Sequence, residues 1–370
     1  MSTRYHTLDH WRGIACLIVV VFHSTHYVAD ASFDARVKSG GASIADALIW
    51  TTSRFWVGVP MFFVISGYCI AASALSHAKH ERPAGEFFKR RLRRIFPPYW
   101  ALFVVAMGFV LLCQRLLGHN GNLTPPWELS GSQLLGNLLL IETWRSHFFG
   151  DETRFFMGHV WTLCYEEQFY LATGLILLTC RRYFFLGCLG LSLVVLALRA
   201  LPDRPNFIAG LFLDGYFLQF AAGIAVCYAA NFANRFEKVA TVTALIVAFA
   251  WCVKQPGQLL SLRANWEQSY AVAFAFAVLL IALHRHDQRL NSLKVLKPLG
   301  IAGVMCYSLY LVHAPFCAVL RRTFYEAGLT TPGQTLLVTT PVCLALSWVV
   351  AWPFHVFIEQ RFMSSGKTER

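Results

Sequence analysis

The stretch from Leu8 to Tyr27 places chemically active side chains in an apolar run: Asp9 and Arg12 lie near its start and His23 near its end. Arg12 and His23 are eleven positions apart, with no charged residue or second histidine between them. On an α-helix this spacing is three turns, so both side chains should share one face, about 16 Å apart along the axis. Ionisable side chains inside a membrane span are costly and usually functional. We therefore predict that they mark two points along the path of one ligand.

These residue types point to particular chemistry. A neutral imidazole such as His23 takes a proton from a hydroxyl near neutral pH. Asp9, three residues before Arg12, can hold the guanidinium in place and offset its charge. His26, one turn beyond His23, is a second and less buried candidate. A structural explanation stays open, in which Arg12 extends to the lipid head groups and His23 only hydrogen-bonds to a neighbouring helix.

A second candidate is the basic run of residues 87–100, FFKRRLRRIFPPYW, at the entrance to another apolar segment. Such a run often only orients a membrane span and contacts lipid phosphate. Arginine, however, can bind phosphate oxygens through two parallel N–H groups, so the alternative is a bound anionic ligand. The arginines concerned are Arg90, Arg91, Arg93 and Arg94. Pro97 and Pro98 fit the first turn of the helix that follows.

Two adjacent acids, Glu166 and Glu167, lie in the segment HVWTLCYEEQFY. Two neighbouring carboxylates in an apolar helix cannot both face lipid, so at least one should point into the protein. Glu166 shares a helical face with His159, seven residues earlier, and is the stronger functional candidate. Glu359, which closes the last apolar run, is expected to form an ion pair at the membrane interface.

Two other segments supply supporting residues. In GVPMFFVISGY, the small residues Ser66 and Gly67 allow another helix backbone to approach closely, and we expect them to pack against the first apolar helix. In CYSLYLVHAPF, Tyr307 precedes His313, and a lone histidine in such a helix is more often a hydrogen-bonded core residue than a catalytic one. We expect Asp9, Ser66, Tyr307 and His313 to shape and support the site.

The composition indicates a membrane protein. The chain has 370 residues, of which 56% are hydrophobic and only 14% charged; a soluble protein would have roughly a quarter charged residues. The net charge of +12 should therefore reflect loops that face anionic lipid, and we expect no nucleic-acid partner. None of the eleven cysteines forms a C-x-x-C motif, so we expect packing residues and no metal site.

The predicted fold is all-α: a polytopic membrane protein of about ten transmembrane helices in a single bundle, with residues 1–370 as one domain. A short apolar piece, residues 134–141, should lie at the interface or re-enter the bundle. The predicted spans are 8–28, 55–76, 97–117, 159–180, 183–200, 208–230, 239–254, 267–284, 302–322 and 335–358.

Basic residues predict the orientation. The connection between the second and third spans carries seven Lys and Arg, against three in the preceding loop. Because basic loops stay in the cytoplasm, both termini should be cytoplasmic and the connection 118–158 should lie outside. We expect the latter to form a more acidic surface through Glu128, Glu142, Asp151 and Glu152. The N-terminus has no small-residue cleavage site, so the first span should be retained.

Taken in order, these motifs resemble the acyltransferase-3 family of integral-membrane O-acyltransferases, and the resemblance covers nearly the whole chain. The family has an arginine, ten intervening residues and then a histidine, which Arg12 and His23 match. The matching segments are LDHWRG, GVPMFFVISGY, FFKRRLRRIFPPYW, HVWTLCYEEQFY, CYSLYLVHAPF and FIEQ.

The resemblance implies an enzyme of the bacterial inner membrane that moves an acyl group, with acetyl favoured, from cytoplasmic acyl-CoA to a hydroxyl of a surface or exported glycan. Arg12 and His23 would act in catalysis and donor handling, and Arg90, Arg91, Arg93 and Arg94 in donor binding. Glu166 would hold the imidazole tautomer or bind the sugar. No permanently bound cofactor is expected; acyl-CoA is a co-substrate, and the partners are a glycan or lipid-linked saccharide acceptor and membrane lipid.

Two other functions stay open. A proton-coupled carrier or lipid-linked sugar translocase would use the same ionisable residues as a proton relay. Carriers commonly contain two related halves, however, and we find no internal repeat. A non-catalytic membrane partner in a polysaccharide complex is the third possibility. The acceptor, the acyl chain and the oligomeric state are not determined by the sequence.

Overall fold

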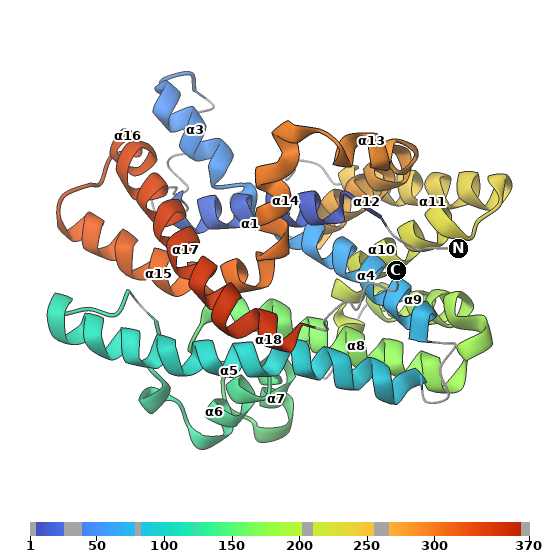
Figure 1. Cartoon of the computed structure of the whole chain (residues 1–370), viewed down its shortest axis with the longest axis horizontal. Helices are drawn as coiled ribbons and strands as arrows, with labels where there is room; N and C mark the ends of the chain where they lie inside the picture. Colours follow the sequence, from blue (N-terminus) through green and yellow to red (C-terminus); the bar gives the residue numbers. More distant parts are fainter. Residues whose placement is uncertain are drawn as a thin grey trace.

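The computed structural model is helical throughout its ordered elements, and no strand occurs among the residues that it describes (Figure 1). This agrees with the all-α prediction. His26 and the residues nearest both termini lie outside the described part, as do the ends of two predicted spans (26–28 and 208–209). The described residues are 5–25, 39–77, 83–121, 123–201, 210–254 and 266–363.

Helices in the first half of the chain are α1 (Leu8–Thr25), α3 (Ile44–Thr52), α4 (Gly58–His77), α5 (Pro83–Leu117), α6 (Gly131–Leu138), α7 (Glu142–Phe149) and α8 (Trp161–Thr179). Those in the second half are α9 (Phe184–Ala200), α10 (Tyr216–Asn231), α11 (Arg235–Val253), α12 (Trp266–Leu283), α13 (Asp287–Asn291), α14 (Lys297–Val304), α15 (Cys306–Glu326), α16 (Pro332–Gln334), α17 (Thr340–Phe354) and α18 (Gln360–Phe362). Short 3₁₀ turns are η1 (Phe55–Val57), η2 (Pro126–Glu128), η3 (Gly158–Val160), η4 (Arg181–Tyr183), η6 (Phe212–Asp214), η7 (His284–His286) and η8 (Lys294–Leu296). Two π-helical turns are η9 (Thr335–Thr339) and η10 (His355–Glu359).

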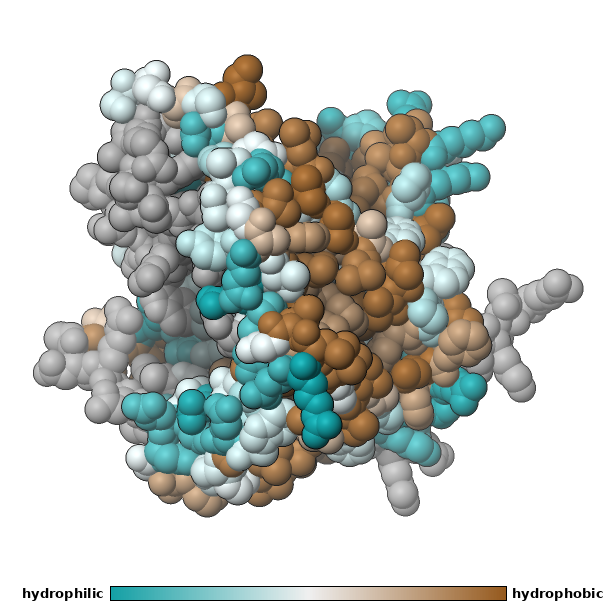
Figure 2. Space-filling model, turned by 90° about the vertical axis from the view of Figure 1, so that its left-hand side faces the viewer, coloured by the Kyte–Doolittle hydropathy of each residue, from teal (hydrophilic) through white to brown (hydrophobic). Residues whose placement is uncertain are grey.

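Six helical stretches of the described chain are long and apolar enough to cross a membrane, and α14 with α15 makes a seventh if this pair, bent by 71°, counts as one span. The ten predicted spans are therefore not confirmed. Helix α10 has only 16 residues, and α1 carries polar residues at both ends. The outward sides of α5, α9 and α11 nevertheless expose large apolar side chains, as expected of helices that face lipid. Figure 2 shows a broad apolar area with hydrophilic side chains beside it, at the end of the molecule that carries α16.

Helix α1 lies inside the bundle and packs against α4, α14, α15 and α17 (Figure 1). Helix α5, the longest of the described helices, runs along one side of the molecule and contacts α4, α8 and α15. It begins at Pro83, so Pro97 and Pro98 lie inside it and the prediction that they start a helix is wrong. The whole basic run is consequently helical, which decides where each of its arginines points.

The connection 118–158 folds back against α5. Helix α6 covers most of the short apolar piece predicted at 134–141, and Tyr99 of α5 donates a 2.7 Å hydrogen bond to the Asn137 carbonyl oxygen. Glu142 is fully buried and accepts two hydrogen bonds from Arg145, at 2.6 and 2.9 Å. Arg145 also donates to Asp151, which lowers the pKa of that carboxyl. The expectation that Glu142 belongs to an acidic surface is thus wrong, because its charge is paired internally.

Helices α4 and α10 meet through two glycines. A methyl group on Gly67 would lie 2.0 Å from the Phe220 carbonyl oxygen, and one on Gly223 would lie 1.9 Å from the Val64 carbonyl oxygen. Close helix contacts in membranes commonly depend on such small residues. The close backbone approach predicted at Gly67 is therefore confirmed, but the backbone concerned is that of α10. The predicted partner, α1, instead meets α4 at Gly58.

Replacing Gly67 by alanine should push α4 and α10 apart and destabilise the protein by about 1–3 kcal/mol, the usual cost of overpacking. The measurement is the thermal midpoint of the purified protein in detergent, followed by size-exclusion chromatography. Gly108→Ala is the control, because Gly108 is exposed on α5 with no other atom near its added methyl group. Equal midpoints for the Gly67 and Gly108 variants would contradict this account of the packing.

Candidate active site

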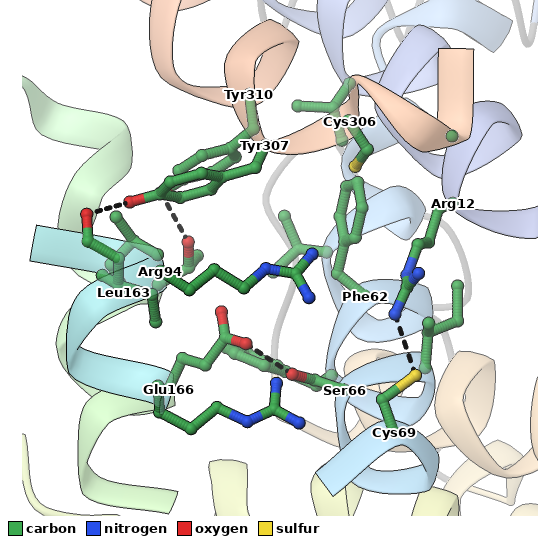
Figure 3. A pocket seen from close by; sticks show the side chains of 18 of the residues that line it. Arg12, Phe62, Ser66, Cys69, Arg94, Leu163, Glu166, Cys306, Tyr307 and Tyr310 are labelled. Carbon is green, nitrogen blue, oxygen red and sulfur yellow. Dashed lines mark hydrogen bonds between the residues drawn. The ribbon is translucent and has the colours of Figure 1, made fainter. Parts of the chain in front are cut away.

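A cavity of about 140 Å³ lies where α1, α4, α5, α8 and α15 meet, and we call it the arginine pocket (Figure 3). Three cationic side chains line it: Arg12 from α1, and Arg91 and Arg94 from α5. Figure 3 shows Arg12 and Arg94 entering from opposite sides. The other polar lining residues are Ser66, Cys69, Thr162, Glu166, Tyr170, Cys306, Tyr307 and Tyr310.

Arg12 is held from two directions. Its Nη1 donates a 2.7 Å hydrogen bond to Asp9 Oδ1, the contact predicted from their i, i+3 spacing, and its Nη2 donates to Cys69 Sγ at 2.9 Å. Figure 3 shows the contact with Cys69 at the wall of the pocket. The guanidinium has five N–H groups, so these two contacts leave others for a ligand. Cys69 was not predicted as a site residue, because only the packing of α4 against α1 brings it to Arg12.

The four arginines predicted to bind the donor do not all line one cavity. Arg91 and Arg94, three residues apart, share a helical face and line the pocket. Arg90 and Arg93 lie on a different face and are exposed, and Arg93 donates instead to the Arg361 carbonyl oxygen at 3.4 Å. Because α5 is continuous through the basic run, its rotation against the neighbouring helices turns Arg91 and Arg94 towards the pocket and leaves Arg90 and Arg93 exposed.

Glu166 lies at the α8 side of the same pocket. Its Oε1 accepts a 2.6 Å hydrogen bond from Ser66 Oγ and a second from the Tyr170 hydroxyl. The predicted site residues Ser66 and Glu166 are thereby joined across α4 and α8. Among the described residues the carboxylate bonds to hydroxyls and not to an imidazole, so the geometry does not place it to fix the tautomer of His23.

A second cavity, of about 400 Å³, contains three imidazoles, and we call it the histidine pocket. The His313 ring lies between the other two, with ring centroids 5.1 Å from His23 and 5.3 Å from His159. Trp56 and Trp161 add aromatic faces to the lining. The three histidines come from α1, η3 and α15, so their meeting is a tertiary feature that spacing in the sequence cannot show.

The two pockets adjoin. Their linings share Val19, Val59, Thr162 and Tyr310. On α1, Arg12, Val19 and His23 follow one stripe with spacings of seven and four residues, so one face of one helix passes from the first pocket to the second. Anion-binding groups at one end and proton-accepting groups at the other suit a ligand that carries phosphates and a reactive carbonyl.

Two further residues, Tyr307 and Glu359, make structural contacts near the start of α15. Tyr307 lines the arginine pocket and donates its hydroxyl to the Ile95 carbonyl oxygen at 2.8 Å. Glu359 is buried and accepts hydrogen bonds from Ser308 at 2.5 Å and from His355 at 2.7 Å. Glu359 thus has an ion-pair partner, His355, when that imidazole is protonated, but the pair is buried inside the protein and not exposed at an interface as predicted.

Comparison with known proteins identifies a family for this chain. The chain matches the acyltransferase domain family, Acyl_transf_3, over residues 5–355. It is similar to O-acetyltransferase OatA of Staphylococcus aureus, with 24% identity over 97% of this chain and 57% of the relative. A shorter region, 33% of the chain and 19% of the relative, is 30% identical to a putative peptidoglycan O-acetyltransferase, YrhL, of Bacillus subtilis.

The chain spans little more than half the length of the OatA relatives that it matches. No solved structure matches it. The predicted limits of a single domain at residues 1–370 are not tested by these matches. Because the family match runs from residue 5 to residue 355, however, the chain belongs to the acyltransferase-3 family of membrane proteins.

Proposed function

We propose that this protein transfers an acyl group, with acetyl favoured, from acyl-CoA to a hydroxyl of a cell-surface or exported glycan. The observation that carries the proposal is the pair of adjoining pockets along one face of α1, with three arginines at one end and three histidines at the other. The names of the relatives, O-acetyltransferase and putative peptidoglycan O-acetyltransferase, support the reaction and the acceptor class.

The donor would bind with its phosphates in the arginine pocket. Arg12, Arg91 and Arg94 can each offer two N–H groups to phosphate oxygens, and no carboxylate other than Glu166 lines this cavity within the described chain. The pantetheine arm would pass between the two pockets beside Val19. Eleven residues of helix separate Arg12 from His23, a rise of about 16 Å, comparable to the reach of that arm. The thioester would then lie near His23.

In the transfer itself, the acceptor oxygen attacks the thioester carbonyl carbon, the carbon–sulfur bond breaks, and coenzyme A leaves as a thiolate that takes up the proton. His23 is placed to handle this proton, directly or through a neighbouring group. Apolar walls exclude water from the thioester, and the pockets fix its orientation. We further propose that the donor enters from the cytoplasm, on the side of the basic run, and the acceptor from the opposite side.

The first test uses membranes that contain the protein, radiolabelled acetyl-CoA and isolated peptidoglycan strands. Transfer of label to the glycan is expected for the wild type, and His23→Ala should lower it by about 100-fold or more while the protein still inserts. Normal transfer by the inserted variant would exclude His23 from the reaction. Uptake of sugar without labelling by the wild type would instead favour the carrier hypothesis.

The second test compares the two arginine pairs. Arg91→Gln with Arg94→Gln should raise the KM for acetyl-CoA by about tenfold or more, since a hydrogen bond to a charged group contributes roughly 1.5–3 kcal/mol. The matched control, Arg90→Gln with Arg93→Gln, removes the same charge from the exposed face and should leave the KM nearly unchanged. Equal effects of the two double variants would show that only the net charge of the run matters.

A further inference from the structure

The imidazole of His313 is fixed in one orientation and one tautomer. The side chain is 1% exposed, and its Nδ1 lies 2.7 Å from the Tyr310 carbonyl oxygen and 3.1 Å from that of Leu309. Carbonyl oxygens only accept hydrogen bonds, so Nδ1 must carry the hydrogen. In the neutral ring the lone pair is then on Nε2.

This Nε2 is buried and has no hydrogen-bond partner among the described residues. Buried polar atoms are nearly always satisfied, and leaving one unsatisfied is costly, so the atom points to a ligand with a hydroxyl or N–H group. His313 lines the histidine pocket, and both ring nitrogens of the neighbouring His159 lack partners in the same way. Trp56 and Trp161 supply flat apolar faces of the kind on which sugar rings pack.

We propose that the histidine pocket is the acceptor site and that Nε2 of His313 takes the proton from the acceptor hydroxyl. The ligand class is a saccharide, whose reacting hydroxyl donates to His313 while a second hydroxyl bonds to His159. This inference rests on the proposed function and adds to it a second catalytic histidine, one that meets the acceptor, whereas His23 meets the donor.

His313 and His23 together can carry the proton of the acceptor hydroxyl to the leaving thiolate. The hydroxyl proton moves to Nε2 of His313 as the acceptor oxygen bonds to the carbonyl carbon. The His313 imidazolium passes this proton to the His23 ring, whose centroid is 5.1 Å away. The carbon–sulfur bond then breaks, and the thiolate of coenzyme A takes the proton from the His23 imidazolium. Both histidines end neutral, and the products are the ester and the free thiol.

The experiment measures transfer from radiolabelled acetyl-CoA to peptidoglycan strands by His313→Asn and His313→Ala in membranes. The asparagine amide can keep the hydrogen bond to the Tyr310 carbonyl oxygen but has no group at the position of Nε2. We expect His313→Asn to insert normally and to lose about 100-fold or more of the rate. Imidazole added to the His313→Ala protein should restore part of it, because the vacated space adjoins a cavity of about 400 Å³.

A rate close to that of the wild type for His313→Asn would overturn the proposal, since it would show that only the backbone contact matters. Failure of imidazole to raise the rate of correctly inserted His313→Ala would also overturn it. His286→Gln changes an exposed histidine that lines neither pocket; it is the control and should keep the full rate. If the wild type itself transfers no label, the proposed function fails; if it does and both His313 variants match it, only the present inference fails.

Discussion

The placement of one partly buried guanidinium, that of Arg12, within an apolar helical bundle is the constraint on which this structure depends. An unpaired charge in such surroundings costs at least several kcal/mol, so Arg12 must be compensated wherever it lies. Asp9 supplies a carboxylate one turn earlier, and Cys69 of α4 supplies a sulfur acceptor. Helix α14 packs against the backbone at Asp9 so closely that a methyl group on Gly303 would lie 1.7 Å from the Asp9 carbonyl oxygen. This contact fixes the position of Asp9 along the bundle.

The length of α5 determines where the arginines of the basic run lie relative to Arg12. A helix that began at the prolines would have left the basic run as an irregular loop, with all its cations in solvent or at lipid head groups. Because the helix instead begins at Pro83, two of the arginines are carried to the wall opposite Arg12 and two stay outside. The three arginines around this small cavity meet two carboxylates, those of Asp9 and Glu166. An added anion would reduce the remaining repulsion, so the arrangement suits the phosphate-bearing donor proposed above.

The histidine pocket depends on a different kind of contact. Its three imidazoles come from separate segments, and the hydroxyl of Tyr310 ties two of these segments together by hydrogen bonds of 2.8 Å to Thr162 and to the His159 carbonyl oxygen. The Tyr310 carbonyl oxygen, on the other side of the same residue, orients His313. One tyrosine therefore forms part of the wall shared by both pockets and sets the tautomer of a histidine in the second.

Features that depend on neighbours within one helix could be predicted from the sequence. The apolar composition indicates helices in a membrane, the eleven-residue spacing places Arg12 and His23 on one stripe, and small residues at Ser66 and Gly67 indicate a close helix contact. The number of spans is not confirmed: six or seven helical stretches of the described chain are long and apolar enough to cross a membrane, whereas α10 is short and α1 has polar ends.

Contacts between helices were decided only by the tertiary structure. Spacing could not show that Glu166 would meet Ser66 and Tyr170 instead of an imidazole, or that His159 and His313 would join His23. Nor could it show that Glu142 and Glu359 would be buried with partners. Helical periodicity fixes the direction of a side chain relative to its own axis, whereas the neighbour that it meets depends on how separate helices rotate and pack, and this is set by contacts between residues far apart in the chain.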